Sequence, residues 1–126
     1  MKGTAVDPRI TWTVGYMQRH LAEPIGVTEL AALVNLSPSR FRHLFGAQTG
    51  LGPGQYLRRL RLRCARLLIE RTFLSVKEVM AVVGYNDPSH FSKDFRRYHG
   101  LSPSALRGRG VATPLPRARD PGQLCA

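Results

Sequence analysis

Two segments of the chain carry side chains that can donate hydrogen bonds at helical spacing. The first, SPSRFRHLF, begins at Ser37, and the second, DPSHFSKDF, begins at Asp87. At about 100° per residue, the face opposite the phenylalanines holds hydroxyl, imidazole, guanidinium and ammonium groups and no acid. Such donors suit guanine O6 and N7 and phosphate oxygens. The outward residues are Ser39, Arg42, His43 and Gly46 in the first segment and Ser89, Ser92, Lys93 and Arg96 in the second.

Capping residues and apolar spacing predict the helices that would position these groups. A cap followed by proline begins a helix at Asp7, Ser37 and Asp87, and Ser75 with Glu78 forms a capping box. Glycines follow the apolar periods as helix stops. The expected helices run from about 8 to 20, 27 to 34, 38 to a stop at 50, 53 to 72, 75 to a stop at 84 and 88 to a stop at 100, with a last short turn from 103.

The two donor-bearing helices belong to an internal repeat. Residues 27–53 align with residues 76–103 when one gap is placed before Pro38. Shared caps, core positions and stops in one order favour two copies of one supersecondary unit over a chance likeness between amphipathic helix pairs. The identical pairs include Val27/Val76, Glu29/Glu78, Pro38/Pro88, Ser39/Ser89, Phe41/Phe91, Phe45/Phe95 and Gly50/Gly100.

Each copy is interpreted as a helix-turn-helix, whose second helix enters the major groove of DNA. The fold class is therefore all-α, with two helix-turn-helix subdomains, 1–52 and 74–107, a linker helix at 53–73 and a disordered basic tail at 108–126. A linker of about 18 residues spans roughly 27 Å. Consecutive major grooves on one face of DNA lie about 34 Å apart, so one chain can reach both, with some bending of the DNA. The linker arginines are candidate phosphate contacts, although charged helix faces are more often solvated.

The charge balance also favours a polyanionic partner. The 126 residues contain 19 Lys and Arg against 8 Asp and Glu, a formal charge of +11. No apolar run reaches the length of a membrane span and no signal segment opens the chain, so we expect a soluble, cytoplasmic protein without membrane contact. Cys64 and Cys125 have no disulfide-framework or zinc spacing, and we expect free thiols in a reducing compartment.

Neither an enzyme nor a cofactor-binding protein is expected from the residue pattern. The histidines fall on different expected helices without a metal-ligand spacing, and the few acids mostly serve as caps. The Gly50-x-Gly52-x-Gly54 run is a linker rather than a nucleotide-binding loop. Two alternative classes stay open: a nonspecific basic protein that binds nucleic acid, and a protein-interaction module.

Residues 8 to about 107 resemble the DNA-binding domain of the AraC/XylS family of bacterial transcription regulators. The resemblance rests on SPSRFRHLF with Thr49-Gly50 and Pro53, on YLRRLRLRCARLL, and on VGYNDPSHFSKDFRRYHGLSPSALR. It implies about seven helices, a monomer that occupies two consecutive major grooves of double-stranded DNA, and transcription activation through contact with RNA polymerase. The chain would then be associated with the nucleoid.

The resemblance also assigns contact residues. It places base reading on Ser39, Arg42 and His43 of the first recognition helix, with Ser37 and Arg40 among the expected DNA contacts. In the second helix it places contacts on Pro88, Ser89, His90 and Lys93, and the helical wheel adds Arg96. Pro88 and Ser89 offer little hydrogen bonding, so the first copy should dominate specificity. His90 lies off the computed outer face and is assigned by the resemblance alone.

Members of the family usually carry a separate effector-binding or dimerisation domain, and this sequence contains no segment that matches one. Two interpretations stay open: a stand-alone member whose activity depends on its amount, and a fragment of a longer regulator.

Overall fold

The computed structural model describes residues 6–114 and residue 125, and within these residues the chain forms α-helices and no β-strand. No helix among them is both long enough and apolar enough to cross a membrane. The helices are α1 (Pro8–Arg19), α2 (Val27–Leu33), α3 (Pro38–Thr49), α4 (Pro53–Arg71), α5 (Val76–Val83), α6 (Pro88–His99) and α7 (Pro103–Arg107).

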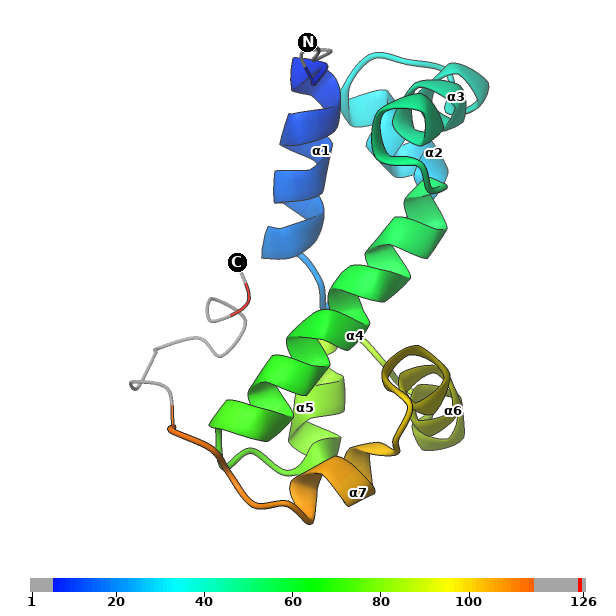
Figure 1. The fold of residues 1–126 in the computed structure, drawn as a ribbon. Coiled ribbons are helices and arrows are strands. Elements are labelled where there is room, and N and C mark those ends of the chain that lie inside the picture. Colours follow the sequence, from blue (N-terminus) through cyan, green and yellow to red (C-terminus); the bar gives the residue numbers. More distant parts are fainter. Residues whose placement is uncertain (1–5, 115–124, 126) are drawn as a thin grey trace, which may run out of the picture.

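The long helix α4 organises the molecule, as Figure 1 shows. Helices α1, α2 and α3 form one group, in which α3 contacts α4, and α5, α6 and α7 form a second group, in which all three contact α4. Helix α2 contacts α3 in the first group, and α5 contacts α6 in the second, as expected for two helix-turn-helix pairs. Helices α3 and α6 lie on the same side of α4, which is the right side in this view.

The helix ends follow the predicted caps and stops. The side chains of Asp7, Ser37, Ser75 and Asp87 each accept a backbone hydrogen bond from the helix that they begin. Ser75 and Glu78 form both bonds of the capping box. The stops at residues 50, 84 and 100 adopt left-handed φ angles of +81°, +89° and +85°, which glycine accepts without steric cost.

The repeat is visible in the two hydrophobic cores. Phe41 and Phe45 of α3 are fully buried with ring centroids 5.6 Å apart, and Phe91 and Phe95 of α6 are fully buried at the same 5.6 Å. Both pairs are tilted, by 50° and 54°, an arrangement that aromatic rings favour. Two phenylalanines at equivalent positions of the repeat therefore pack each of these helices, α3 and α6, against the rest of its subdomain.

The last turn of α6 differs from the sequence-based prediction. Helical spacing with Phe91 and Phe95 predicts Tyr98 on the apolar side of this helix. In the structure Tyr98 is 39% exposed, and its ring lies beneath the guanidinium of Arg59, with Cζ 5.8 Å from the ring centroid. His99 takes the inner place instead, with its ring 4.5 Å from that of Phe95. A phenol next to an arginine can stay at the surface because its ring stacks on the cation.

The prediction of two free thiols is wrong, because Cys64 and Cys125 form a disulfide with their Cα atoms 5.2 Å apart. Cys64 lies in α4 and is almost fully buried. Of the predicted disordered tail, residues 108–114 run along the end of α4. The amide of Ala112 donates to the carbonyl of Glu70 at 2.8 Å, and Arg71 Nε donates to the carbonyl of Thr113 at 3.1 Å. The rest of that tail, except Cys125, lies outside the described residues.

Removal of the disulfide should destabilise the fold. The bond joins residues 61 positions apart. Closing a loop of that length in the unfolded chain is worth up to about 4 kcal/mol. We expect Cys125→Ser to lower the free energy of unfolding by up to this amount, measured by urea denaturation without reductant.

A thiol reductant should weaken the wild-type chain in the same way and leave Cys125→Ser unchanged, which serves as the control. The bond would be refuted if the chain, unfolded without reductant, showed two titratable thiols.

Candidate nucleic-acid interface

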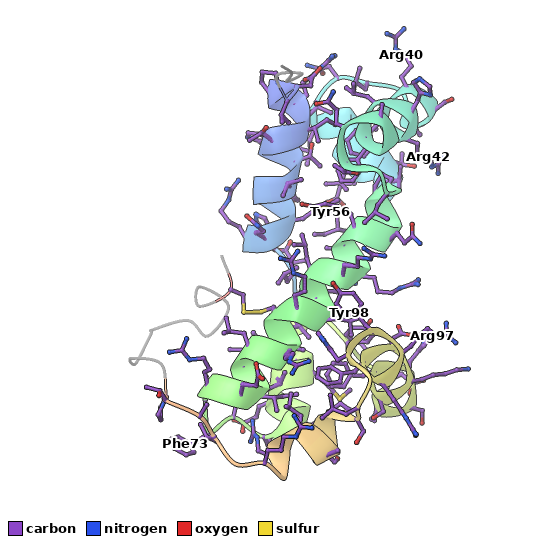
Figure 2. The ribbon with its side chains drawn as sticks, in the orientation of Figure 1. Arg40, Arg42, Tyr56, Phe73, Arg97 and Tyr98 are labelled. Carbon is purple, nitrogen blue, oxygen red and sulfur yellow. A yellow bond between two sulfur atoms is a disulfide. The ribbon has the colours of Figure 1, made fainter. Side chains whose placement is uncertain are left out.

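Helix α3 presents a donor-bearing face to solvent. The expected contact residues Ser39, Arg40, Arg42 and His43 are all exposed on it, and Figure 2 shows Arg40 and Arg42 projecting away from the body of the molecule. Ser37 is also exposed, but its hydroxyl accepts the amide of Arg40 at 3.2 Å as the helix cap. Ser37 therefore has a structural role at the start of this helix.

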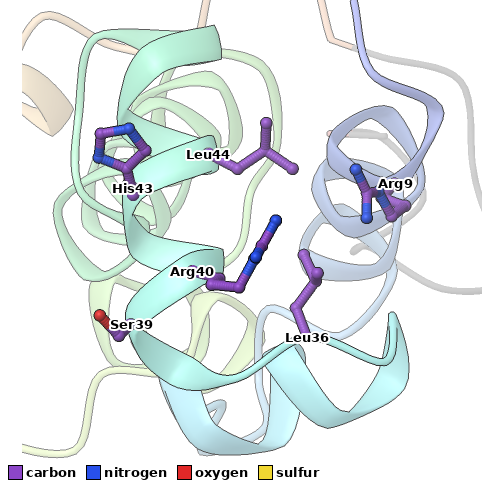
Figure 3. A pocket seen from close by; sticks show the side chains of 6 residues that line it. All are labelled: Arg9, Leu36, Ser39, Arg40, His43 and Leu44. Atoms are coloured by element: carbon purple, nitrogen blue, oxygen red, sulfur yellow. The ribbon is translucent and has the colours of Figure 1, made fainter.

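A hollow beside α3 brings three of these residues together with one from α1. Arg9, Ser39, Arg40 and His43 line an open space of about 390 Å³, with Leu36 and Leu44 as its apolar part. In Figure 3 the side chains of Arg9 and Arg40 approach the space from its two sides. The sequence analysis did not include Arg9, because only the packing of α1 against α3 brings it to the recognition helix.

Arg9 is held in place by the residue that caps its own helix. Its Nη2 and Nε lie 2.9 and 3.1 Å from the two carboxylate oxygens of Asp7, and this pairing lowers the pKa of Asp7. The Asp7 amide in turn donates to Gln48 Oε1 of α3 at 2.8 Å. One capping residue therefore connects the start of α1, the cationic side of the hollow and the recognition helix.

Helix α6 exposes a more strongly cationic face. Pro88, Ser89 and His90 are exposed in its first turn, where the Asp87 carboxylate accepts the amides of Ser89 at 2.9 Å and His90 at 3.3 Å. Farther along, a second open hollow of about 450 Å³ collects several donors. Its lining comprises Lys93 and Arg96, both predicted, together with Ser92, Arg97 and Ser102.

Arg97 was missed by the sequence analysis. At about 100° per residue, Arg97 lies about 40° from the direction opposite Phe91 and Phe95, which is within the outer arc. The set of outward residues chosen from the sequence ended at Arg96 and left Arg97 out. Its neighbour in the hollow is Ser102, which follows the Gly100 stop. A basic residue near the end of a helix is commonly explained by the helix dipole, but the helical wheel was a signal that could have found Arg97.

The acidic residue of α6 is kept off the exposed face. Asp94 is half-buried, and its carboxylate accepts a hydrogen bond from the hydroxyl of Tyr85 at 3.0 Å. Burial and the carboxylate of Asp94 both raise the pKa of Tyr85, so the phenol stays protonated and continues to donate. The Tyr85 ring also packs on Phe91, with centroids 5.0 Å apart. This arrangement orients α6 and leaves its outer face with basic and neutral groups.

Some arginines of α4 are paired with other groups of the protein, and others are exposed. Arg61 donates to backbone carbonyls, and Arg66 Nε lies 3.3 Å from a carboxylate oxygen of Glu70. Arg58, Arg59 and Arg63 are exposed. The arginines of α4 therefore do not form one common phosphate-binding row, whereas the exposed faces of α3 and α6 each carry donors that suit base edges and phosphates.

Comparison with known proteins agrees with this geometry. Residues 30–109 match a helix-turn-helix domain family. The chain is 38% identical over 110 residues to the HTH-type transcriptional regulator GbdR of Pseudomonas aeruginosa, and 35% identical over 106 residues to the HTH-type transcriptional activator RhaS of Klebsiella pneumoniae. These alignments cover 86% and 84% of this chain but only 30% and 38% of the relatives.

Solved structures share the fold. The DNA-binding domain of AdpA, solved in complex with a target DNA, superposes with a TM-score of 0.77 at 33% identity. The match covers 82% of this chain and 93% of that domain. The chain thus spans about a third of the length of the curated relatives it matches and nearly the whole of this DNA-binding domain.

Acidification should destabilise the fold through His99. Its Nε2 lies 2.9 Å from the carbonyl oxygen of Leu62, and burial lowers its pKa below the ordinary value of 6.5. As the pH falls below 6.5, His99 of the unfolded chain binds a proton more readily than His99 of the folded chain. Stability from this histidine is therefore complete above about pH 6.5 and is lost as the pH falls through the lowered pKa.

We expect the melting temperature to fall between pH 7 and pH 5, and His99→Gln to reduce this pH dependence. His90→Gln, on the exposed side of the same helix, is the matched control and should leave the dependence unchanged. Equal pH profiles for His99→Gln and the wild type would contradict the assignment.

Proposed function

Because the chain belongs to the AraC/XylS family of helix-turn-helix proteins, we propose that it binds double-stranded DNA sequence-specifically and regulates transcription as an activator. In this proposal α3 and α6 enter consecutive major grooves from one side of α4. The observation that carries it is the pair of exposed, donor-rich helix faces on that side. The 19 residues of α4 span roughly 28 Å, close to the separation of about 34 Å between grooves.

The two helices would divide the work of recognition. On α3, Arg42 supplies a guanidinium that can bind guanine O6 and N7 in a bidentate manner, and Ser39 and His43 add shorter donors. On α6, Lys93 and Arg96 suit phosphate oxygens, while Pro88 and Ser89 allow close approach without reading many base edges. Sequence discrimination would then come mainly from the first half-site.

The same proposal extends to the protein partner and the compartment. RNA polymerase would be the protein partner, and the similarity to the transcriptional activator RhaS supports this. The bacterial cytoplasm, which holds the chromosome, would be the compartment. We assign to this chain only the DNA-binding part of the relatives' role, because it matches about a third of their length. The proposed mechanism uses no catalytic group, metal ion or cofactor.

The experiment is selection from a random duplex library, followed by titration of the selected site with wild type and Arg42→Ala at two salt concentrations. We expect a bipartite motif with half-sites about one helical turn apart. Loss of one bidentate base contact should weaken the selected site by about 1–3 kcal/mol and relax specificity in one half only. Binding should also weaken steeply with salt, as phosphate contacts require.

Arg19→Ala is the matched control, because Arg19 is an exposed arginine that ends α1, and this end of α1 lies away from α3 and α6 in Figure 1. It should change binding little and leave the motif intact. Equally tight, sequence-blind binding by wild type and Arg42→Ala would leave a nonspecific basic protein as the interpretation. No measurable DNA binding at all would favour a protein-interaction module.

A further inference from the structure

Arg61 connects the middle of α4 to the first subdomain. Its Nε donates to the carbonyl oxygen of Leu21 at 3.1 Å, and its Nη2 donates to the carbonyl oxygen of Glu23 at 2.9 Å. Both carbonyls belong to the connection between α1 and α2. The guanidinium is half-buried, and this burial lowers its pKa. A planar fork of donors can hold two neighbouring carbonyls at once, which an ammonium cannot do in the same geometry.

The second subdomain meets the same carbonyl. Gly84 ends α5 in the turn before α6, and a Cβ built on it would lie 2.2 Å from the oxygen of Leu21 and 3.2 Å from Nε of Arg61. The backbone of Gly84 therefore packs directly against the α1–α2 connection. Any side chain at this position would push the α5–α6 turn away from that connection. Three segments meet around one oxygen atom: the α1–α2 connection, the middle of α4 and the turn of the second helix-turn-helix.

We call this meeting point of Leu21, Arg61 and Gly84 the joint. Contacts connect the joint to the second recognition helix. Tyr85 directly follows Gly84, donates to Asp94 of α6 at 3.0 Å and packs on Phe91 of the same helix. On the other side, Leu21 is buried in the hydrophobic core. A short series of hydrogen bonds and close contacts therefore runs from the first subdomain through Arg61 and Gly84 to α6.

We propose that Arg61 is a positioning residue that fixes the orientation of α6 relative to α3 and thereby sets the half-site spacing that the chain accepts. This inference rests on the proposed function. One added base pair moves a half-site by about 3.4 Å and rotates it by roughly 35° around the DNA axis. A chain with a fixed joint cannot follow that rotation without bending the DNA, whereas a chain with a loosened joint can.

The test compares Arg61→Lys with Arg63→Lys. Arg61→Lys keeps the charge but not the planar fork. Arg63 is an exposed arginine on the same helix, so it provides the matched control. For each protein, the dissociation constant is measured for the selected site and for sites with one base pair inserted or removed between the half-sites.

Wild type and Arg63→Lys should discriminate against the altered spacings by about tenfold or more, which corresponds to about 1.4 kcal/mol or more. Arg61→Lys should discriminate by no more than about threefold and bind the isolated first half-site like wild type. Unchanged discrimination in Arg61→Lys would overturn the proposal.

Residual dipolar couplings of the free protein give a readout that does not depend on DNA. The two subdomains of wild type and Arg63→Lys should fit a single alignment tensor, whereas those of Arg61→Lys, or of the neutral variant Arg61→Gln, should require two. Failure of wild type to bind any bipartite site would refute the proposed function, while these couplings would still decide the role of Arg61. A single tensor in both variants would overturn the inference. Unfolding of both variants would do so too, because Arg61 would then determine stability rather than orientation.

Discussion

Both subdomains depend on the packing of their small cores against one uninterrupted helix. Near the start of α4, the ring of Tyr56 meets Phe45 of α3 edge-on, with centroids 5.3 Å apart. In its middle, the carbonyl of Leu62 accepts His99 of α6, and the following apolar residues of α4 are buried beside α5. Neither subdomain is large enough to bury much surface by itself, so each completes its core with a part of α4. The exposed faces of α3 and α6 are held in space because their buried faces share this support.

The local features of the fold could be predicted from sequence because they depend on neighbours in the chain. The caps at Asp7, Ser75 and Asp87 and the stop at Gly84 require only backbone groups within a few residues, and the structure confirms them. The exposed face of each recognition helix follows from helical period once the buried phenylalanines are identified. The seven helices and the family could therefore be predicted from the sequence, and the domain boundaries stay predictions.

Apart from Arg97, the features that sequence analysis missed depend on contacts between distant segments. Arg9 joins the first hollow only because α1 packs on α3, and the exchange of Tyr98 and His99 depends on Arg59 of α4. The disulfide joins Cys64 to a residue near the chain end, a pairing that spacing alone does not indicate. It encloses α5, α6 and α7 and none of the first subdomain. In a compartment that keeps thiols reduced, the second subdomain would rely on its apolar core and on α4 alone.

The two copies share one scaffold but differ in the chemistry of their outer faces, and this difference has a physical consequence. The outer face of α3 carries Ser39, Arg42 and His43, whereas α6 gathers Lys93, Arg96 and Arg97 around one hollow. Phosphate attraction is long-ranged and independent of sequence, while base reading acts only at hydrogen-bonding distance. A cationic second subdomain can therefore supply affinity without demanding a particular base sequence. It supplies that affinity at a defined distance and rotation relative to α3 only if the contacts of Arg61 and Gly84 with Leu21 are kept. A contact away from the outer faces of α3 and α6 therefore influences which DNA sites the chain can occupy.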